Sequence, residues 1–180
     1  MNQVLDSIKA RRSVRKFQDK PVDEATLQTL LEVVQWSPSW ANTQCWEVIV
    51  VKDPALREQL QAAMAKGNPA TKTIVSAPLL LVLCAKKNSS GYYNGQVTTK
   101  YGDWMLYDLG IASMSLCLAA HSLGLGSVVV GLFDHDAAAR AVGLPEGYEL
   151  VSILPMGYPD QSPKAPPRKE ISQFVHYDRF

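Results

Sequence analysis

The stretch "APLLLVLCA", residues 77–85, is a continuous apolar run about as long as one β-strand, with Pro78 near its start and the polar Lys86 directly after it. A strand with one face in water alternates apolar and polar residues, whereas this run does not alternate. The stretch therefore predicts a central strand that other parts of the fold cover on both faces.

Helices and further strands are predicted on both sides of this strand in the sequence. Asp23 is expected to cap one helix, Asp53 with Pro54 to open another, and Asp134 to open a third. The predicted helices span residues 2–12, 23–37, 54–66, 104–123 and 134–143, and the predicted strands lie at 48–51, 77–85, within 124–131 and at 149–154. Alternating helices and strands of these lengths indicate a mixed α and β protein.

Three segments stand out between and after these elements. Residues 86–103 are polar and glycine-containing, which predicts a surface loop or an irregular lid. Residues 104–123 are rich in small side chains, which favours a helix close to another backbone, in the core or at a subunit interface. Residues from about 160 to 180 are rich in proline and charge and predict an extended arm, with a small apolar grip at Ile171, Phe174 and Val175.

The bulk properties narrow the class of protein. A chain of 180 residues that is 47% hydrophobic fits one domain. With 18 Lys and Arg against 17 Asp and Glu, the net charge is +1, which argues against a nucleic-acid partner. No apolar run is long enough to cross a bilayer and no signal-peptide core is recognisable, so we expect no membrane partner and a cytoplasmic location. Three cysteines without C-x-x-C spacing predict neither a disulfide framework nor a zinc site.

Motifs for several common chemistries are missing. The glycines of "GLGSVVVG", residues 124–131, do not have the G-x-G-x-x-G spacing and enter a strand, so a Rossmann site is not expected. The sequence also lacks a P-loop, a G-x-S-x-G elbow and an H-E-x-x-H motif. The histidines are too scattered to indicate a metal site.

The run "RRSVRKF", residues 11–17, places four cations within six positions. Mutual repulsion disfavours such a run unless water or a bound anion neutralises it. Two readings therefore stay open, a solvated turn and an anion site. Two further stretches bear on the choice: "SPSWANTQCW", residues 37–46, a proline-started polar turn before a strand, and Arg168 with Lys169 after two prolines. Taken alone, residues 37–46 also fit an ordinary loop between a helix and a strand, and Arg168 with Lys169 also fits a frayed basic tail.

Together these stretches resemble the FMN-dependent nitroreductases. "RRSVRKF" is similar to that family's N-terminal flavin motif, "SPSWANTQCWEVIVV" to its turn and strand, and "LAAHSLGLGSVVVGLFD" to its later glycine-containing strand. "LVSILPMGYP" and "PPRK" complete the order of motifs. The resemblance implies an α+β fold with a mixed central sheet flanked by helices, assembled as an intertwined homodimer with FMN sites at the subunit interface.

The resemblance also implies roles for individual residues. Carried over position by position, it implies that the flavin phosphate, ribityl chain and pyrimidine edge are bound by Arg11, Arg12, Ser13 and Arg15. From the partner subunit, the flavin would be approached by Pro38, Ser39 and Asn42, with Gln44 as a weaker candidate. Val130 and Gly131 would lie beside the flavin N5, and Arg168 with Lys169 would close on the phosphate. Arg15, with Lys72 as a second cation, would stabilise charge on the N1–C2 edge of the reduced flavin. Residues 86–103 would select the substrate. Cys45 and Trp40 depart from the family pattern, and Asn68 is left unassigned.

The implied activity is hydride transfer from NADH or NADPH through flavin N5 to a nitroaromatic, quinone or similar acceptor, by a ping-pong sequence without a dedicated protein acid or base. Three alternatives stay open from sequence. The same fold could carry a reductive dehalogenase or a flavin-fragmenting oxygenase. The chain could bind flavin without turnover, as a redox sensor or scaffold. It could also be a flavin-free domain with a solvated basic turn.

Overall fold

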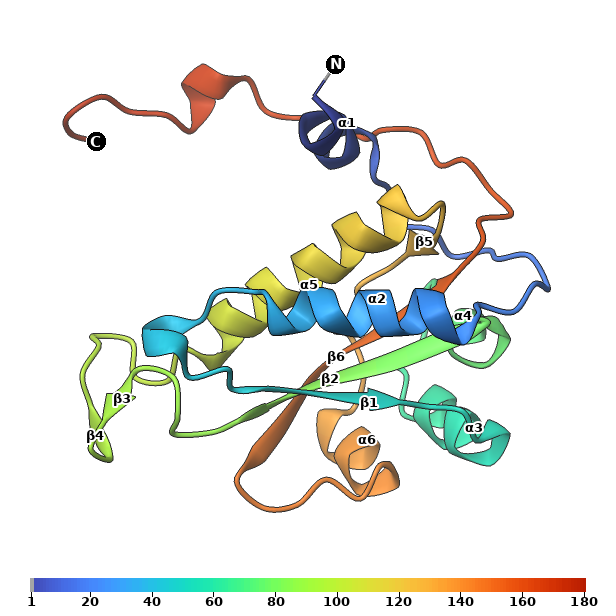
Figure 1. Ribbon diagram of the computed structural model, residues 1–180, viewed down its shortest axis with the longest axis horizontal. Helices are drawn as coiled ribbons and strands as arrows, with labels where there is room; N and C mark the ends of the chain where they lie inside the picture. Colours follow the sequence, from blue (N-terminus) through green and yellow to red (C-terminus); the bar gives the residue numbers. More distant parts are fainter. Residues whose placement is uncertain (1) are drawn as a thin grey trace.

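The computed structural model describes residues 2–180 and shows an α+β protein built on one four-stranded sheet (Figure 1). The strands are β1 (Trp46–Val50), β2 (Leu79–Lys86), β5 (Gly126–Ser127) and β6 (Tyr148–Gly157), in the order β1-β2-β6-β5. Each neighbouring pair of strands runs antiparallel. Among residues 2–180, parallel pairing is confined to the bridge between Ser13 and Ser127. The expected α+β class is confirmed, and its mixed character rests on that bridge.

Helices cover both faces of the sheet (Figure 1). On one face lie α2 (Glu24–Gln35) and α5 (Met105–Ser122), which pack on each other. On the other face lie α3 (Pro54–Ala62) and α6 (His135–Ala141), and α4 (Thr71–Ser76) packs on α3. The N-terminal helix α1 (Gln3–Ala10) packs on α5 and has no buried residue. The sheet is therefore the middle of three layers.

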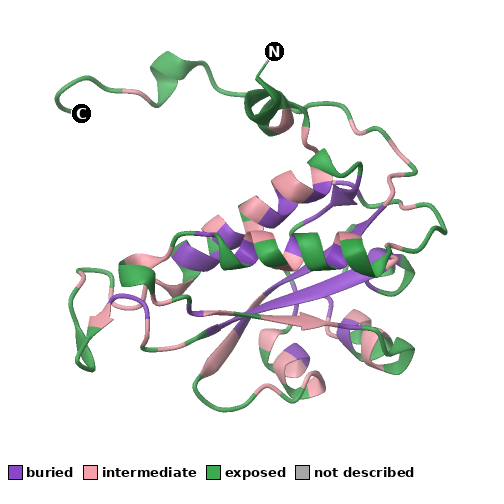
Figure 2. Ribbon diagram, viewed as in Figure 1, coloured by how far each residue is buried: buried purple, intermediate pink, exposed green. Residues whose placement is uncertain are grey.

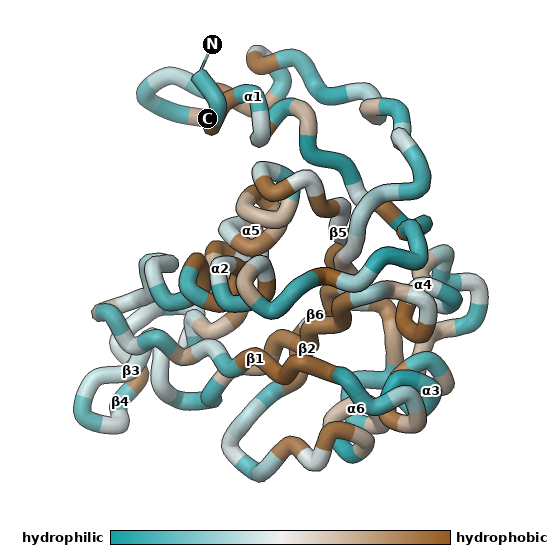
Figure 3. The backbone as a smooth tube through the Cα atoms, turned by 45° about the vertical axis from the view of Figure 1, so that its right-hand side comes forward, coloured by the Kyte–Doolittle hydropathy of each residue, from teal (hydrophilic) through white to brown (hydrophobic). Residues whose placement is uncertain are grey.

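Strand β2 contributes side chains to both hydrophobic cores. Its side chains alternate between the two faces of the sheet, so Leu79, Leu81 and Leu83 enter the core beneath α2 and α5. Leu80, Val82 and Cys84 enter the core beneath α3, α4 and α6. Figure 2 shows β2 almost wholly buried, and Figure 3 shows the centre of the sheet as the most hydrophobic part of the chain. The prediction of a strand covered on both faces is confirmed.

The predicted helix starts are also confirmed. The carboxylates of Asp23, Asp53 and Asp134 accept hydrogen bonds from the backbone N–H groups of Thr26, Ala55 and Ala137, at 2.8, 2.9 and 2.9 Å. Such N-caps satisfy backbone donors that have no partner inside the helix. The predicted ends are less accurate: α2 stops at Gln35 instead of residue 37, and the helix from Pro54 stops at Ala62 instead of residue 66.

Two features of the structure differ from the expectation. The short helix α4 was not predicted from sequence. Residues 86–103 are not irregular throughout, because β3 (Tyr92–Tyr93) and β4 (Gln96–Val97) form a hairpin. Its two turn residues, Asn94 and Gly95, have φ angles of +49° and +75°. Positive φ at both central positions is the requirement of a type I′ turn, and Asn-Gly is the preferred pair there.

The last segment of the chain runs away from the sheet (Figure 1). Residues 161–170 contain no helix or strand, and only a short 3₁₀ turn, η2 (Ile171–Gln173), follows. The described residues do not bury the expected apolar contact, since Ile171 and Phe174 are 69% and 58% exposed. No helix among the described residues is both long enough and apolar enough to span a membrane.

We predict that Gly126→Ala lowers the free energy of unfolding by about 2 kcal/mol. A Cβ at Gly126 would lie 2.7 Å from the Cβ of Val14 and 2.8 and 2.9 Å from its two Cγ atoms, which alanine lacks, so the close approach of Val14 to β5 requires glycine. Urea denaturation would measure the loss. The double variant Gly126→Ala with Val14→Ala should recover part of it. If the double variant lost as much stability as the two single variants together, a steric origin would be contradicted.

Candidate active site

The arginine-rich segment is anchored to the sheet through one buried residue. Val14 is buried, and its N–H donates to the carbonyl of Ser127 at 2.9 Å. Because side chains alternate along an extended segment, Ser13 and Arg15 face away from Val14. The guanidinium of Arg12 donates to the carbonyl oxygens of Lys9 and Arg11, at 2.6 and 2.8 Å. The sheet edge thus holds the backbone that presents these cations.

A cavity of about 310 Å³ opens on these cations. It is lined by Arg11, Arg12, Ser13, Arg15, Pro163, Lys164, Pro166 and Arg168, without an acidic residue. The Nε of Arg11 is buried and has no hydrogen-bond partner among the described residues. Guanidinium groups bind phosphate and carboxylate oxygens in fixed, forked geometry. The cavity is therefore suited to a small, doubly charged anion.

A second cavity, of about 220 Å³, lies on the other side of Arg15. It is lined by Arg15, Asn68, Pro69, Ala70 and residues 128–132. Val130 is fixed there by two backbone hydrogen bonds with Ile153, both of 2.9 Å. Gly131 is exposed, and a Cβ on it would meet no atom within 4 Å. Because glycine has no side chain, the backbone of Gly131 lines the cavity directly, while its carbonyl oxygen lies 3.2 Å from Nε2 of His135. Arg15 lines both cavities and joins them.

Asn68 belongs to this second cavity, although sequence left it unassigned. Its side-chain amide donates to the carbonyl of Leu132 at 2.9 Å, and its oxygen accepts the N–H of Ala70 at the same distance. These bonds tie the segment before α4 to residues 128–132. The signal available from sequence was the Asn-Pro pair of residues 68–69, which marks a turn but does not reveal which strand the turn will meet.

The polar turn of residues 37–44 lies elsewhere. It contains the 3₁₀ turn η1 (Trp40–Asn42) and contacts the first turn of α5, whereas the cationic segment lies beside β5, which follows the end of α5. α5 has 18 residues, which corresponds to a length of about 27 Å. Figure 1 shows η1 and β5 at opposite ends of that helix. One copy of the chain therefore does not bring Pro38, Ser39, Asn42 and Gln44 to the arginines.

The two remaining predicted cations lie outside both cavities. Lys169 and Lys72 are exposed and line neither cavity. Lys72 is nevertheless next to Thr73, whose hydroxyl donates to the carbonyl of Arg15 at 3.0 Å. Among residues 2–180, no group of three His, Cys, Asp or Glu side chains is placed to hold a metal ion.

All three thiols are buried and resist ionisation. Burial, together with the nearby Asp108 carboxylate, raises the pKa of Cys45 to about 11. Burial likewise raises the pKa of Cys84 to about 12 and raises that of Cys117, although the Ser127 hydroxyl and Arg11 oppose the latter shift. A protonated, buried thiol is a poor nucleophile. None of the cysteines therefore qualifies as a catalytic group.

Comparison with known proteins gives one consistent result. The model of the Nitroreductase family matches residues 8–158. The FMN reductase (NAD(P)H) of Bacillus subtilis is 32% identical, with 92% of this chain and 70% of that protein covered. The NADPH-flavin oxidoreductase of Vibrio harveyi is 31% identical, with 100% and 75% covered. The crystal structure of nitroreductase A from Vibrio parahaemolyticus superposes with a TM-score of 0.86 at 30% identity, covering 100% of this chain and 77% of that one.

We predict that the folded protein loses stability as the pH rises above about 9. The unfolded chain releases thiol protons near pH 8.5, whereas the folded chain retains them because burial raises each thiol pKa. Each raised thiol pKa thus stabilises the fold below pH 8.5, and this contribution is lost between there and the folded pKa, at up to about 1.4 kcal/mol per pH unit. Urea denaturation at pH 8, 9 and 10 would measure the slope. A Cys84→Ala variant with an unchanged slope would contradict this origin.

Proposed function

The chain belongs to the nitroreductase family, and on that premise we propose that it is an FMN-dependent oxidoreductase that takes hydride from NADH or NADPH and passes it to a nitroaromatic, a quinone or a similar small acceptor in alternating half-reactions. The observation that carries the proposal is the pair of adjoining cavities that share Arg15. One is lined by cations without a carboxylate, and the other by Arg15, residues 68–70 and the mainly apolar residues 128–132. This pairing suits a ligand with a phosphate at one end and a flat ring system at the other.

The cation-lined cavity fits the phosphate of FMN. A phosphate monoester carries about two negative charges near neutral pH. The cavity offers five cationic side chains and no carboxylate, and the buried Nε of Arg11 has an unused proton to donate. Binding such an anion would relieve the repulsion among Arg11, Arg12 and Arg15. An anion accounts for the "RRSVRKF" run better than a solvated turn does, because these arginines line one cavity that holds no carboxylate to neutralise them.

The second cavity fits the ring end. When bound, FMN supplies a centre, N5, that accepts a hydride from a nicotinamide and returns it to a second substrate. Gly131 would let the ring edge approach the backbone closely, because no side chain intervenes. Arg15 would place its charge beside the pyrimidine edge, where negative charge gathers on reduction. Asn68 holds residues 128–132 in place through its bond to Leu132.

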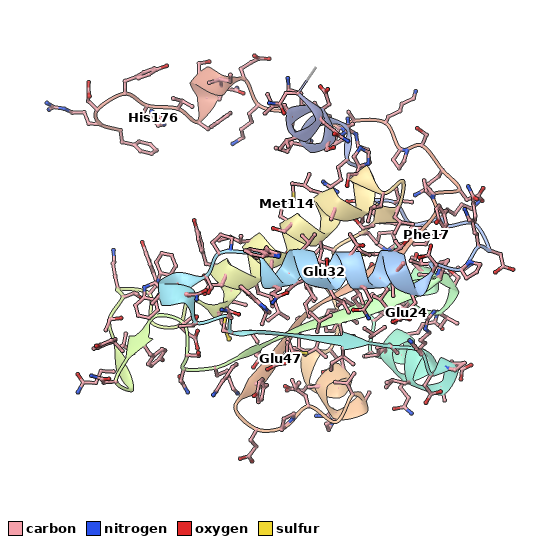
Figure 4. All side chains as sticks on the ribbon, in the orientation of Figure 1. Phe17, Glu24, Glu32, Glu47, Met114 and His176 are labelled. Carbon is pink, nitrogen blue, oxygen red and sulfur yellow. The ribbon has the colours of Figure 1, made fainter. Side chains whose placement is uncertain are left out.

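The second half of the site would come from another copy of the chain. The turn of residues 37–44 and the cationic segment lie at opposite ends of α5. Two copies related by a twofold axis, with their α5 helices antiparallel, would bring the turn of one copy to the cations of the other. The outer face of α5 is apolar enough for such contact: Leu106, Tyr107 and Met114 are 59%, 63% and 40% exposed. Figure 4 shows Met114 on the side of α5 away from the sheet.

The arm of residues 160–180 is part of the same proposal. Its exposed Ile171, Phe174 and Tyr177 have no partner within the described chain that buries them. A second copy would bury them, and Pro38, Ser39 and Asn42, with Gln44 as the weaker candidate, would then complete the flavin site. Lys169 would extend the cationic cluster from this arm. A cytoplasmic location, where NADH and NADPH are maintained, also belongs to the proposal.

The proposal predicts that the purified protein, incubated with FMN and freed of excess, keeps a yellow absorption band that bleaches with NADH or NADPH under anaerobic conditions. An added quinone or nitroaromatic should restore the band. Arg15→Gln should weaken FMN binding about 10- to 100-fold, since hydrogen bonds from a charged group contribute roughly 1.5–3 kcal/mol. Arg140→Gln, which removes an arginine of α6 that lines neither cavity, serves as the matched control.

The results of this experiment distinguish the proposed function from its alternatives. Retained colour that neither nicotinamide bleaches would favour a flavin-binding sensor over an enzyme. Bleaching followed by loss of flavin and appearance of fragments under air would favour a flavin-consuming oxygenase. Halide release from a halogenated aromatic would favour a reductive dehalogenase. A colourless protein would return residues 11–17 to a solvated turn.

We also predict that Met114→Lys converts a dimer into a monomer and releases FMN. The new charge would sit in the centre of the apolar face of α5, where pairing would desolvate it. Light scattering gives the mass, and circular dichroism verifies that the fold persists. Gln59→Lys, on the exposed side of α3, introduces the same charge on the opposite face of the sheet and should leave the dimer intact. A flavin-loaded monomer would overturn the shared site.

A further inference from the structure

Asp108, in the first turn of α5, is 1% exposed, and among the described residues no Lys, Arg or His forms an ion pair with it. A buried carboxylate without a cation is costly unless hydrogen bonds satisfy it. Here they come from two other segments of the chain, residues 40–45 and the segment that contains Ser90. Each carboxylate oxygen lies 3.1 Å from the N–H of Trp40, and one also accepts the hydroxyl of Ser90 at 2.5 Å and contacts the thiol of Cys45 at 3.8 Å.

The turn that Asp108 holds has an unusual backbone. Ala41, Asn42 and Gln44 have φ angles of +45°, +55° and +48°. Residues other than glycine adopt this region uncommonly, and such a conformation persists only where the surroundings hold it. Within the turn, the hydroxyl of Ser39 accepts the N–H of Gln44 at 2.9 Å. Asp108 supplies the anchor from outside, at Trp40 and Cys45, on either side of the strained residues.

The same carboxylate also reaches the hairpin segment. Ser90 is fully buried, and its carbonyl accepts the N–H of Trp104 at 3.0 Å, next to the start of α5. The carbonyl of Cys45 accepts the N–H of Lys86 at 2.7 Å, where residues 86–103 begin. Asp108 is therefore the group at which the turn of residues 37–44, the hairpin segment of residues 86–103 and α5 meet.

We propose that Asp108 is a positioning residue that fixes the turn of residues 37–44 for flavin binding and couples it to the hairpin segment of residues 86–103. The flavin part of this inference rests on the function proposed above. Asp108 itself touches neither cavity. Its effect on the flavin passes through the backbone between Ser39 and Asn42. Its effect on the acceptor passes through Ser90 and rests on the expectation that residues 86–103 select the substrate.

The variant Asp108→Asn tests the proposal with little change in volume. Its amide keeps one acceptor for Trp40 but loses the charge and the second acceptor. Asp103→Asn is the matched control, because Asp103 lies at the same end of α5 and its two oxygens accept the N–H groups of Asn88 and Met105, at 2.6 and 2.9 Å, without contacting the turn. Both variants remove one carboxylate that joins the hairpin segment to α5.

The dissociation constant of FMN, the visible circular dichroism of bound flavin, and kcat and KM at saturating FMN are measured on the flavin-loaded protein, with its mass verified by light scattering. Asp108→Asn should weaken FMN binding at least 10-fold, alter the flavin circular dichroism and raise the KM for the acceptor. Asp103→Asn should change FMN binding less than 2-fold. A lower melting temperature of Asp108→Asn with FMN binding and circular dichroism unchanged would overturn the proposal.

Hydrogen exchange of the flavin-free protein separates this inference from the function it rests on. Asp108→Asn should speed exchange both in residues 39–45 and in residues 88–91, whereas Asp103→Asn should affect only the second segment. Faster exchange in one segment alone for Asp108→Asn would overturn the coupling. A wild-type protein that binds no FMN would overturn the proposed function and the flavin role of Asp108, while the exchange result would still decide the coupling.

Discussion

The structure depends on the burial of β2 on both faces. Because the side chains from Leu79 to Ala85 all leave water, β2 needs a layer of helices on each side, and the neighbouring strands β1 and β6 satisfy its backbone. The two cores then fix where each connection crosses the sheet. The segments before α2, after α5 and before α4 converge at one end of the sheet, where Val14, β5 and Thr73 hold the backbone of the arginine run. The rigid middle layer thus positions a loop that carries charge.

The sequence predicted best what local chemistry decides. Aspartates at the starts of helices and the unbroken apolar run of β2 need only their immediate neighbours to act, and the structure bears them out. Helix α4 was missed because it is short and its first residue is capped by no side chain. The hairpin of residues 92–97 had a usable signal in Asn94-Gly95, but strands of two residues show no alternation that would support it.

Only the part of the candidate site that is formed by residues adjacent in the sequence could be predicted. The arginines of residues 11–15 are adjacent in the chain, so their shared cavity follows from the sequence once an anion is assumed. Asn68 meets Leu132 through the packing of α4 beside residues 128–132, which no spacing reveals. Asp108 was hidden for a related reason. Its sequence context is an ordinary helix start, and its importance comes from Trp40, Cys45 and Ser90, which reach it from other segments.

The β3–β4 hairpin has a consequence for how chain length can vary in this fold. Its tip is exposed, its strands pair only with each other, and it contributes no residue to either core. Closing a longer flexible loop costs only about 0.6 kcal/mol for each doubling of its length. Insertions between β3 and β4 would therefore leave both cores and the Asp108 anchor unchanged. A longer insertion can therefore be accommodated at the hairpin without a change of fold. Proteins of different length could then share one cofactor site and differ in the substrates that reach it.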